Sequence, residues 1–520
     1  MNGGRAAAFV LALATLYAGV HWGSTVAGGA DSYGYVSQAM LWRSGTLTNQ
    51  QEIVGRSPWP LASETWAPLG YRPAAPGSDR IVPLYPAGLP LLMAAAQVAG
   101  GFCATFLVVP LSGAIVVWLT YVLGQQLFAR PMISAGGALL VATSPVFVYQ
   151  LMNPMTDVPV TAAVAGAMTL AAAGLPAWAG FVSGIALLIR PNLILIPAAI
   201  ALWLFVTRVG ALRFVAGLLP AAATVALINL RLYGSPLTSG YGTIGDLYSV
   251  TYSTTNVCQF GAWLVETQTP VVVLAAVALA MPGVFAGPVP RARLLAGGVV
   301  VAAALSYLFY IPFDAWWYLR FLLPMWPVLM LAVAAAIYAF ARAVPMGAAA
   351  VAVVILALAA NGIRVASNRF AFDVGRAERR YVDVARFIAS HTDSNAAIVS
   401  LQHSGTLRLY AGRLTLRFDQ LDAAWLDRAL VFLREQGHRP YFVLEADEAA
   451  RFTERFAAMN SAGTLGKPIA TYASPPVAVY DPFERSEREP LAIAASTARR
   501  SGWRCDPPSA LAASGIDQGR

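Results

Sequence analysis

The chain has 520 residues, of which 58% are hydrophobic and only 12% are charged. Soluble domains carry about 25% charged residues, so this composition excludes an ordinary soluble protein and favours a multi-pass membrane protein. The net charge of +9 comes from arginines scattered singly beside apolar segments. That scatter argues against nucleic acid as a partner, and it indicates topology signals and phosphate ligands.

Eleven apolar segments are predicted to cross the membrane, most of them close to the roughly 20 residues that a spanning helix needs. They are residues 6–23, 103–128, 132–152, 158–173, 176–189, 191–207, 214–230, 269–287, 294–311, 321–341 and 345–363. The short apolar segment 86–99 is left out, because counting it would move Arg130, Arg208 and further loop arginines to the outer side. We expect this segment to lie at the outer interface or to dip halfway into the bilayer.

The acidic residues of the bundle all fall in gaps on one side of it. Before position 364 they are Asp31, Glu52, Glu64, Asp79, Asp157, Asp246, Glu266 and Asp314. A carboxylate is costly in hydrocarbon, so these gaps mark where water and chemistry meet. The outer loops 24–102, 231–268 and 312–320 are long, whereas the inner connections are bare. This favours an enzyme working on one face. The alternative, a transporter or flippase of lipid-linked sugars, would be expected to show internal repeats and a midplane site.

Beyond residue 365 the charges become dense and the pattern changes to α/β. Helices are predicted at 376–391, 422–436 and 446–459, and strands at 396–401, 414–418 and 440–445. An odd number of spans after an inner amino terminus puts this part, residues 366–483, on the outer face as a small soluble domain. The polar segment 484–520 is predicted to be a disordered tail. The predicted fold class is therefore an all-α membrane bundle, residues 1–365, followed by a C-terminal α/β domain.

Two carboxylates are candidates for chemistry at the outer boundary. Asp31 lies in GGADSYGYVSQAMLWRSG (28–45), where the glycines allow a sharp exit from the first span. Asp157 lies on a short outer turn in SPVFVYQLMNPMTDVPV (144–160). Either residue also suits a plain helix N-cap. A capping carboxylate held at this level could also take a proton from an incoming hydroxyl.

Arginines supply the complementary charge. Arg190 stands beside a helix-breaking Pro191 in an apolar hairpin, where it suits an anion or simply snorkels at a helix end. Arg320 follows Trp316 and Trp317, so it is either a phosphate ligand or an interfacial anchor. Arg72 flanks a Pro/Gly-rich loop and is a further phosphate candidate.

The second large loop starts at Arg231 and contains Tyr241. Its aromatic and turn-forming residues suit contact with carbohydrate or lipid. The three cysteines, Cys103, Cys258 and Cys505, are far apart and indicate neither a metal site nor a disulfide framework. The four histidines are dispersed. No cofactor is predicted, and a divalent metal is left open without a ligand cluster. There is no P-loop in the sequence, which indicates that any transfer uses a donor that is already activated.

In chain order, these motifs resemble a known family. They are the Asp-x-Tyr of 31–33, YPAGLPLL (85–92), NPMTDVP (153–159), GIALLIRPN (184–192), NLRLYGSPLTSGYG (229–242) and YLRFLLP (318–324). Over residues 5–365 the chain resembles the GT-C glycosyltransferases of the protein O-mannosyltransferase and lipid A aminoarabinose transferase type. Two positions depart from the family pattern. Ser32 follows Asp31 where many relatives have a second acid, and residues 83–86 hold no lysine.

The resemblance implies an integral enzyme of a bacterial-type inner or plasma membrane, with its active site on the extracytoplasmic side. Such an enzyme moves a hexose or pentose from a polyprenyl-phosphate donor to a lipid, glycan or protein acceptor, with inversion. Asp31 would be the catalytic base and Asp157 the second acidic residue. Donor phosphate would be held by Arg190, Arg320 and Arg72. The substrate loops would contribute Tyr33, Tyr85, Arg231 and Tyr241.

Overall fold

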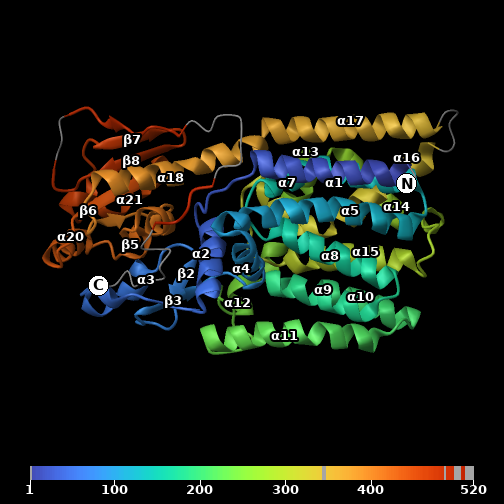
Figure 1. Cartoon of the computed structure of the whole chain (residues 1–520), viewed down its shortest axis with the longest axis horizontal. Coiled ribbons are helices and arrows are strands. Elements are labelled where there is room, and N and C mark those ends of the chain that lie inside the picture. The colour runs from blue at the N-terminus through green and yellow to red at the C-terminus, as the bar shows by residue number, and fades with distance from the viewer. Residues whose placement is uncertain (1–2, 342–346, 485–487, 497–504, 510–520) are drawn as a thin grey trace.

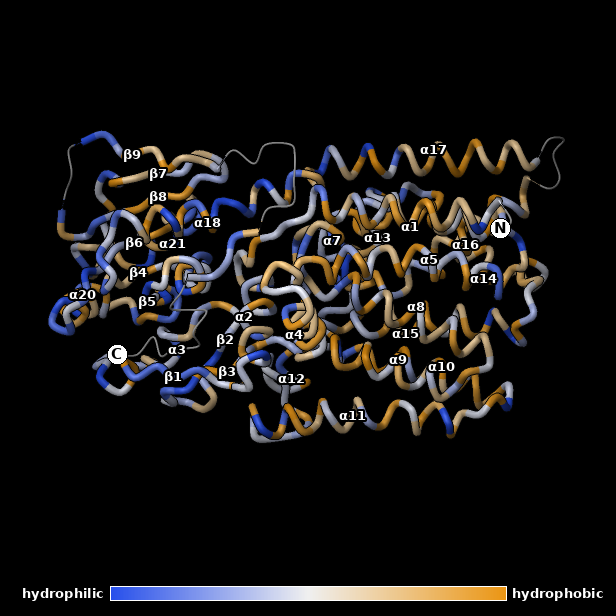
Figure 2. Tube along the Cα trace, in the orientation of Figure 1, coloured by the Kyte–Doolittle hydropathy of each residue, from blue (hydrophilic) through white to orange (hydrophobic). Residues whose placement is uncertain are grey.

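A bundle of near-parallel helices fills one half of the molecule, and a mixed α/β region fills the other (Figure 1). The computed structural model describes residues 3–341, 347–484, 488–496 and 505–509. The amino terminus lies at the end of the bundle that faces away from the α/β region. Hydrophobic colour dominates the bundle, and hydrophilic colour increases in the α/β region (Figure 2).

The bundle helices are mostly apolar, because each is buried by its neighbours or faces the surrounding hydrocarbon. They are α1 (Gly3–Trp22), α5 (Val108–Phe128), α6 (Pro131–Thr143), α7 (Pro145–Leu151), α8 (Asp157–Ala172), α9 (Pro176–Ile189), α10 (Leu195–Thr207), α11 (Ala211–Tyr233), α13 (Ser253–Gln268), α14 (Leu274–Ala280), α15 (Ala292–Leu308), α16 (Trp326–Ala341) and α17 (Gly347–Asn368). A stretch of tight helical turns, η7 (Trp316–Met325), leads into α16.

The structure does not confirm the eleven spans that the sequence predicts. By length and composition, five helical segments in the described residues can cross a membrane, or seven if each of two bent pairs counts as one span. The predicted span 132–152 is the pair α6–α7, bent by 59° before Pro145, and the predicted span 269–287 belongs to a pair bent by 116° before Pro270. Proline removes a backbone donor and clashes with the preceding turn, which explains both breaks. Most of the other predicted spans are apolar helices of 10–17 residues.

Helix α4 (Gly88–Gly100) is the segment that the sequence analysis left out of the spans. Its 13 residues extend over about 20 Å, which is less than the roughly 30 Å of a hydrocarbon core. It packs against α2 (Asp31–Ser44) where the bundle meets the α/β region. Helix α4 therefore does not cross the membrane by itself, and it forms part of the wall between the two halves.

The first outer loop folds into a small antiparallel sheet of order β1-β3-β2, with a short helix α3 (Ala62–Trp66). Its strands are β1 (Asn49–Gln50), β2 (Tyr71–Pro73) and β3 (Arg80–Pro83). The second outer loop contains the single turn α12 (Ile244–Leu247). Both loops lie next to α2 and α4, so they cover the same end of the bundle.

The α/β region is built on a six-stranded sheet of order β5-β4-β6-β8-β7-β9. The strands are β4 (Ala397–Val399), β5 (Leu414–Leu416), β6 (Pro440–Glu445), β7 (Ala470–Ala473), β8 (Pro476–Tyr480) and β9 (Leu491–Ala492). Strands β4, β5 and β6 pair in parallel, whereas β8 is antiparallel to β6 and β7. Three helices pack on the sheet: α18 (Val374–His391), α20 (Leu426–Glu435) and α21 (Ala446–Phe456). The predicted strands coincide with β4, β5 and β6, and the sequence analysis missed β7, β8 and β9.

The first outer loop and the α/β region share their hydrophobic cores. One core joins Ala27 and Tyr33 of the loop to Tyr381 and Tyr410 of the α/β region. A second core joins Trp66 of the loop to residues of β4, β5 and β6. Burial of common apolar surface thus ties the α/β region to the segment that leads into α2.

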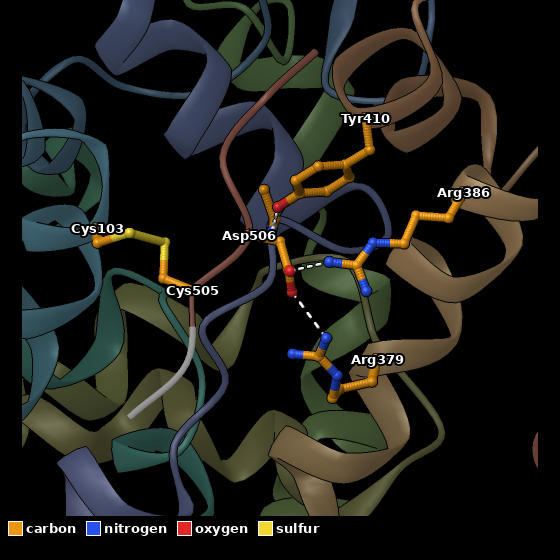
Figure 3. Close-up of a disulfide and its surroundings, with 7 residues drawn as sticks. Cys103, Arg379, Arg386, Tyr410, Cys505 and Asp506 are labelled. Atoms are coloured by element: carbon orange, nitrogen blue, oxygen red, sulfur yellow. Dashed lines mark hydrogen bonds and ion pairs between the residues drawn. A yellow bond between two sulfur atoms is a disulfide. The ribbon is translucent and has the colours of Figure 1, made fainter. Parts of the chain in front are cut away.

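The expectation that the cysteines form no disulfide framework is wrong, and the predicted disordered tail belongs only in part to the described residues. Cys103 and Cys505 form a disulfide, drawn in Figure 3, whereas the sequence analysis expected none. The two cysteines are 402 residues apart, so only the folded chain brings them together. Of the predicted disordered tail 484–520, the described part contributes β9 and the buried Asp506. The ranges 485–487, 497–504 and 510–520 lie outside the described residues.

Candidate functional site

A cavity of about 310 Å³ lies where the bundle meets the first outer loop. It is enclosed by the start of α2, the residues before α4, the α9–α10 junction, the end of α15 and η7. Its lining is aromatic and polar, with charge from Asp31, Arg190 and Arg320. Five of the predicted site residues from distant parts of the chain thus meet in one cavity: Asp31, Tyr85, Arg190, Tyr241 and Arg320.

Asp31 is the first residue of α2, and Ala30 occupies the N-cap position. The Tyr85 hydroxyl donates to Asp31 Oδ1 at 2.6 Å, and Arg320 Nη2 donates to Asp31 Oδ2 at 3.2 Å. The Asp31 side chain is 31% exposed, so the carboxylate remains open to the cavity. Asp31 is therefore oriented by these two partners and by the turn before α2.

Asp157 forms a buried ion pair with Arg190. Arg190 Nη2 lies 2.5 Å from Asp157 Oδ1, Nε donates to the Thr156 hydroxyl at 3.1 Å, and Nη1 donates to the Tyr307 hydroxyl at 3.3 Å. Arg190 directly follows α9 in extended conformation, at the break that Pro191 predicts. Asp157 is 1% exposed and does not line the cavity. It therefore lies behind Arg190, and not face to face with Asp31.

Arg320 connects the two carboxylates. Its Nη2 lies 3.2 Å from Asp31 Oδ2 and its Nη1 lies 4.0 Å from Asp157 Oδ2. The guanidinium stands over the rings of Tyr318 and Phe321, with distances of 5.1 and 5.4 Å to their centroids. Within the described residues, buried Arg320 Nε has no hydrogen-bond partner. A planar guanidinium with a spare buried donor, beside a cavity, is suited to bind a phosphate oxygen.

Tyrosines form much of the remaining lining. Tyr85 and Tyr241 of the predicted substrate loops both line the cavity, with ring centroids 5.9 Å apart. The sequence analysis missed Tyr35, Tyr307 and further aromatic residues of the lining. Tyr35 could have been found, because it follows Asp31 by four residues and so shares its helix face. Tyr307 gives no such signal, since it comes from the end of α15.

The other predicted site residues lie outside this lining. Arg72 Nη1 donates to the Gly240 carbonyl at 3.1 Å, and its guanidinium stands over the Tyr233 ring at 5.8 Å. Arg72 therefore joins the two outer loops next to Tyr241. Tyr33 is buried against the α/β region, where a Cβ on Gly405 would lie 2.2 Å from its ring. Arg231 is exposed in the last turn of α11.

The described residues contain no group of three or more His, Cys, Asp or Glu side chains arranged to hold a metal ion. The charges of the site instead pair with one another: two guanidinium groups face two carboxylates. Opposite charges at this distance stabilise each other strongly where water is scarce. An anionic ligand in this cavity would meet the Arg320 guanidinium, which is paired with Asp31.

No protein-family model matches the chain, and no curated protein matches it by sequence. Solved structures do match it by fold. ArnT from Cupriavidus metallidurans, bound to undecaprenyl phosphate, is 14% identical, with 88% of this chain and 96% of that chain covered and a TM-score of 0.57. The oligosaccharyltransferase from Archaeoglobus fulgidus, tethered with an acceptor peptide, is 12% identical, with 92% and 74% covered and a TM-score of 0.51.

A further structure of the Archaeoglobus fulgidus enzyme, AglB, contains an inhibitory peptide and a dolichol-phosphate. It is 10% identical to this chain, covers 86% of it and 70% of its own length, and has a TM-score of 0.50. These proteins have the GT-C fold of membrane glycosyltransferases. The fold that the sequence motifs predict is therefore confirmed.

Proposed function

We propose that this protein is a membrane glycosyltransferase that moves a sugar from a polyprenyl-phosphate donor to a hydroxyl acceptor outside the cytoplasm. The observation that carries the proposal is the pairing of Asp31 and Arg320 in one cavity, with Oδ2 and Nη2 3.2 Å apart. A carboxylate that accepts a proton and a guanidinium that receives an anion are the two groups that such a transfer needs.

The proposed step is a single displacement. The acceptor oxygen attacks the anomeric carbon, its proton passes to an Asp31 oxygen, and the bond between that carbon and the phosphate oxygen breaks. Polyprenyl phosphate leaves, and the anomeric centre is inverted. When Asp31 takes the proton it loses its negative charge, so Arg320 is released from their ion pair at the moment when charge grows on the leaving phosphate.

The two arginines have different parts in this proposal. Each nitrogen of Arg190 donates to a protein partner, Thr156, Tyr307 or Asp157, so Arg190 supplies fixed positive charge to the cavity wall. Arg320 has a spare donor and supplies the direct phosphate contact. Asp157 acts through Arg190 and does not touch the reacting atoms. Arg72 lies outside the lining, and we assign it the role of joining the two outer loops.

A smaller cavity of about 20 Å³ adjoins the main one and shares Tyr85, Pro86, Pro191 and Ser239 with it. The apolar residues Leu188 and Val225, from α9 and α11, line its other side. It lies between the charged centre and the apolar helices α9 and α11, on the side where we expect the polyprenyl chain to leave the main cavity. The undecaprenyl phosphate of the ArnT structure and the dolichol-phosphate of the AglB structure support a donor of this class.

Two features support the outward orientation. Arg5 and Arg130 belong to the end of the bundle where Gly4 meets Pro131, and basic residues favour the cytoplasmic side. Cys103 closely follows α4, which lies at the opposite end of the bundle, and disulfides persist in oxidising compartments outside the cytoplasm. The cavity would then open outside a bacterial-type plasma membrane.

Purified protein in liposomes tests the proposal. We expect it to transfer a hexose or pentose from a polyprenyl-phosphate donor to a hydroxyl-bearing envelope lipid, glycan or protein, with mass spectrometry identifying the product. Asp31→Asn keeps the size of the side chain and should lower kcat by about 10²–10⁴-fold without lowering the unfolding temperature. Wild-type rates in this variant would remove Asp31 from the mechanism. Movement of the donor across acceptor-free vesicles, without transfer, would instead establish a flippase.

A further inference from the structure

The turn that leads into Asp31 is fixed by contacts with the α/β region. This turn, residues 23–30, joins α1 to α2. Its first half is fixed to the bundle, because Ser24 N donates to the Met152 carbonyl at 2.8 Å. Its second half is fixed to the α/β region, because Ala27 N donates to the Tyr410 hydroxyl at 2.9 Å. Ala27 is fully buried, so this amide depends on a protein acceptor.

Helix α18 also packs against this turn. A Cβ on Gly28 would lie 2.1 Å from Glu378 Oε2 and 2.4 Å from the Tyr381 ring, so only glycine fits between the turn and α18. The Gly28 carbonyl accepts the Tyr33 amide at 3.3 Å, which joins the turn to the first residues of α2. A shift of the turn would therefore move the start of α2, and Asp31 with it.

Tyr410 is itself firmly held. It belongs to the π-helical turn Leu407–Ala411 and is 8% exposed. Figure 3 shows it beside Asp506, whose carboxylate is bound by Arg379 and Arg386 of α18. The backbone of Ser509 donates to the Leu409 carbonyl at 2.8 Å. Residues 505–509 thus contact both α18 and the Tyr410 turn, and these contacts hold Tyr410 beside the loop that leads into α2.

We propose that Tyr410 is a positioning residue for Asp31, acting through Ala27 and the 23–30 turn; this rests on the proposed transfer reaction. Tyr410 does not touch substrate. Its hydroxyl fixes the backbone, so that the Asp31 carboxylate meets the Tyr85 hydroxyl and Arg320 in the orientation in which it accepts a proton. Small misplacements of a reacting group lower rates steeply, by about 10²-fold for 1 Å, so the loss of one remote hydrogen bond has a measurable effect on kcat.

Tyr410→Phe tests the proposal, with Tyr472→Phe as a matched control. Tyr472 is also buried in the α/β region, and its hydroxyl donates to Asp383 at 3.3 Å, away from the turn. We expect Tyr410→Phe to lower kcat about tenfold with the donor KM unchanged, because the cavity wall that binds donor is intact. Tyr472→Phe should lower stability by a similar amount and leave kcat at the wild-type value. Equal kcat values in the two variants would overturn the proposal.

Hydrogen exchange of residues 24–35 gives a second measurement that does not depend on transfer. We expect these amides to exchange faster in Tyr410→Phe than in Tyr472→Phe or the wild type. If this exchange is unchanged in Tyr410→Phe, Tyr410 does not hold the turn and the proposal is wrong, whatever the protein catalyses. If exchange rises as expected while wild-type protein transfers no sugar, the proposed function fails and the structural link stands.

Discussion

Two buried ion networks of this molecule differ in how completely their polar atoms are paired. In the α/β region both Asp506 oxygens are taken, one by Arg379 and one by Arg386. At the cavity, buried Arg320 Nε has no hydrogen-bond partner within the described residues, and neither has Oδ2 of Asp157, which lies behind Arg190. A saturated network fixes the chain, whereas a buried donor left without a partner favours the binding of a ligand that supplies one. The comparison separates a structural network from one that is suited to bind an anion.

Breaking the Arg190–Asp157 pair is expected to have the largest effect. Arg190→Ala leaves the fully buried Asp157 with Arg320 alone, at 4.0 Å. Removing one partner of a buried pair costs about 3–5 kcal/mol, and transfer should be lost as well. Thermal unfolding in detergent and the transfer assay measure the two effects. The double variant Arg190→Ala with Asp157→Asn should regain stability and stay inactive, whereas regained transfer would show that the pair only stabilises the fold.

Removing the disulfide tests the saturated network around Asp506. Cys103→Ser releases residues 505–509 from the bundle but leaves Asp506 with its two arginines. We expect the free energy of unfolding to fall by about 2–4 kcal/mol, since the cross-link restricts the unfolded chain. At a temperature where the variant is folded, kcat should stay within about twofold of the wild type, because the ion pairs still hold the Tyr410 turn. Cys258→Ser, at an exposed and unpaired cysteine, is the control.

Arg320→Lys tests the proposed role of Arg320 as the phosphate ligand at the cavity. Lysine keeps the charge but loses the planar fork and the spare Nε donor, so it cannot contact Asp31 and a phosphate together. We expect kcat/KM for the donor to fall about 10–100-fold, while the unfolding temperature changes little. Arg379→Lys at the saturated network should instead lower the unfolding temperature and kcat, because Tyr410 is held less firmly, and leave the KM for the donor unchanged. An equal rise of the donor KM in both variants would erase the distinction between the networks.

The sequence motifs led to much of the cavity, because its charges are rare in an apolar background. Asp31, Arg190 and Arg320 were predicted as site residues, and they line one cavity. The bent pairs were not predicted, although Pro145 and Pro270 are local signals for the two breaks. The Cys103–Cys505 disulfide was not predicted because it depends on contacts between segments that are distant in the sequence, and helix periodicity carries no information on such contacts. The shared core of the first loop and the α/β region was hidden for the same reason.

The α/β region should also show a pH dependence of folding, which arises from two glutamates of one capping box. Burial raises the pKa of Glu448 to about 7. Burial also opposes the ionisation of Glu445, but its contacts with His403 and Arg380 prevail and lower its pKa to about 2. The two carboxylates of one capping box therefore titrate at opposite ends of the acidic range.

Their effects on stability have opposite signs. Folded Glu448 holds a proton that the unfolded chain has lost, so its contribution falls as pH rises from about 4.5 to about 7. Glu445 is ionised in the folded chain, so its contribution falls as pH drops from about 4.5 to about 2. We expect the unfolding temperature to decline between pH 4.5 and 7, and Glu448→Gln to remove that decline. A decline that persists in Glu448→Gln would assign it to another group. Because Glu448 lies outside the cavity, the pH profile of kcat in Glu448→Gln should match that of the wild type. This result would show that different groups control the pH dependence of folding and that of transfer.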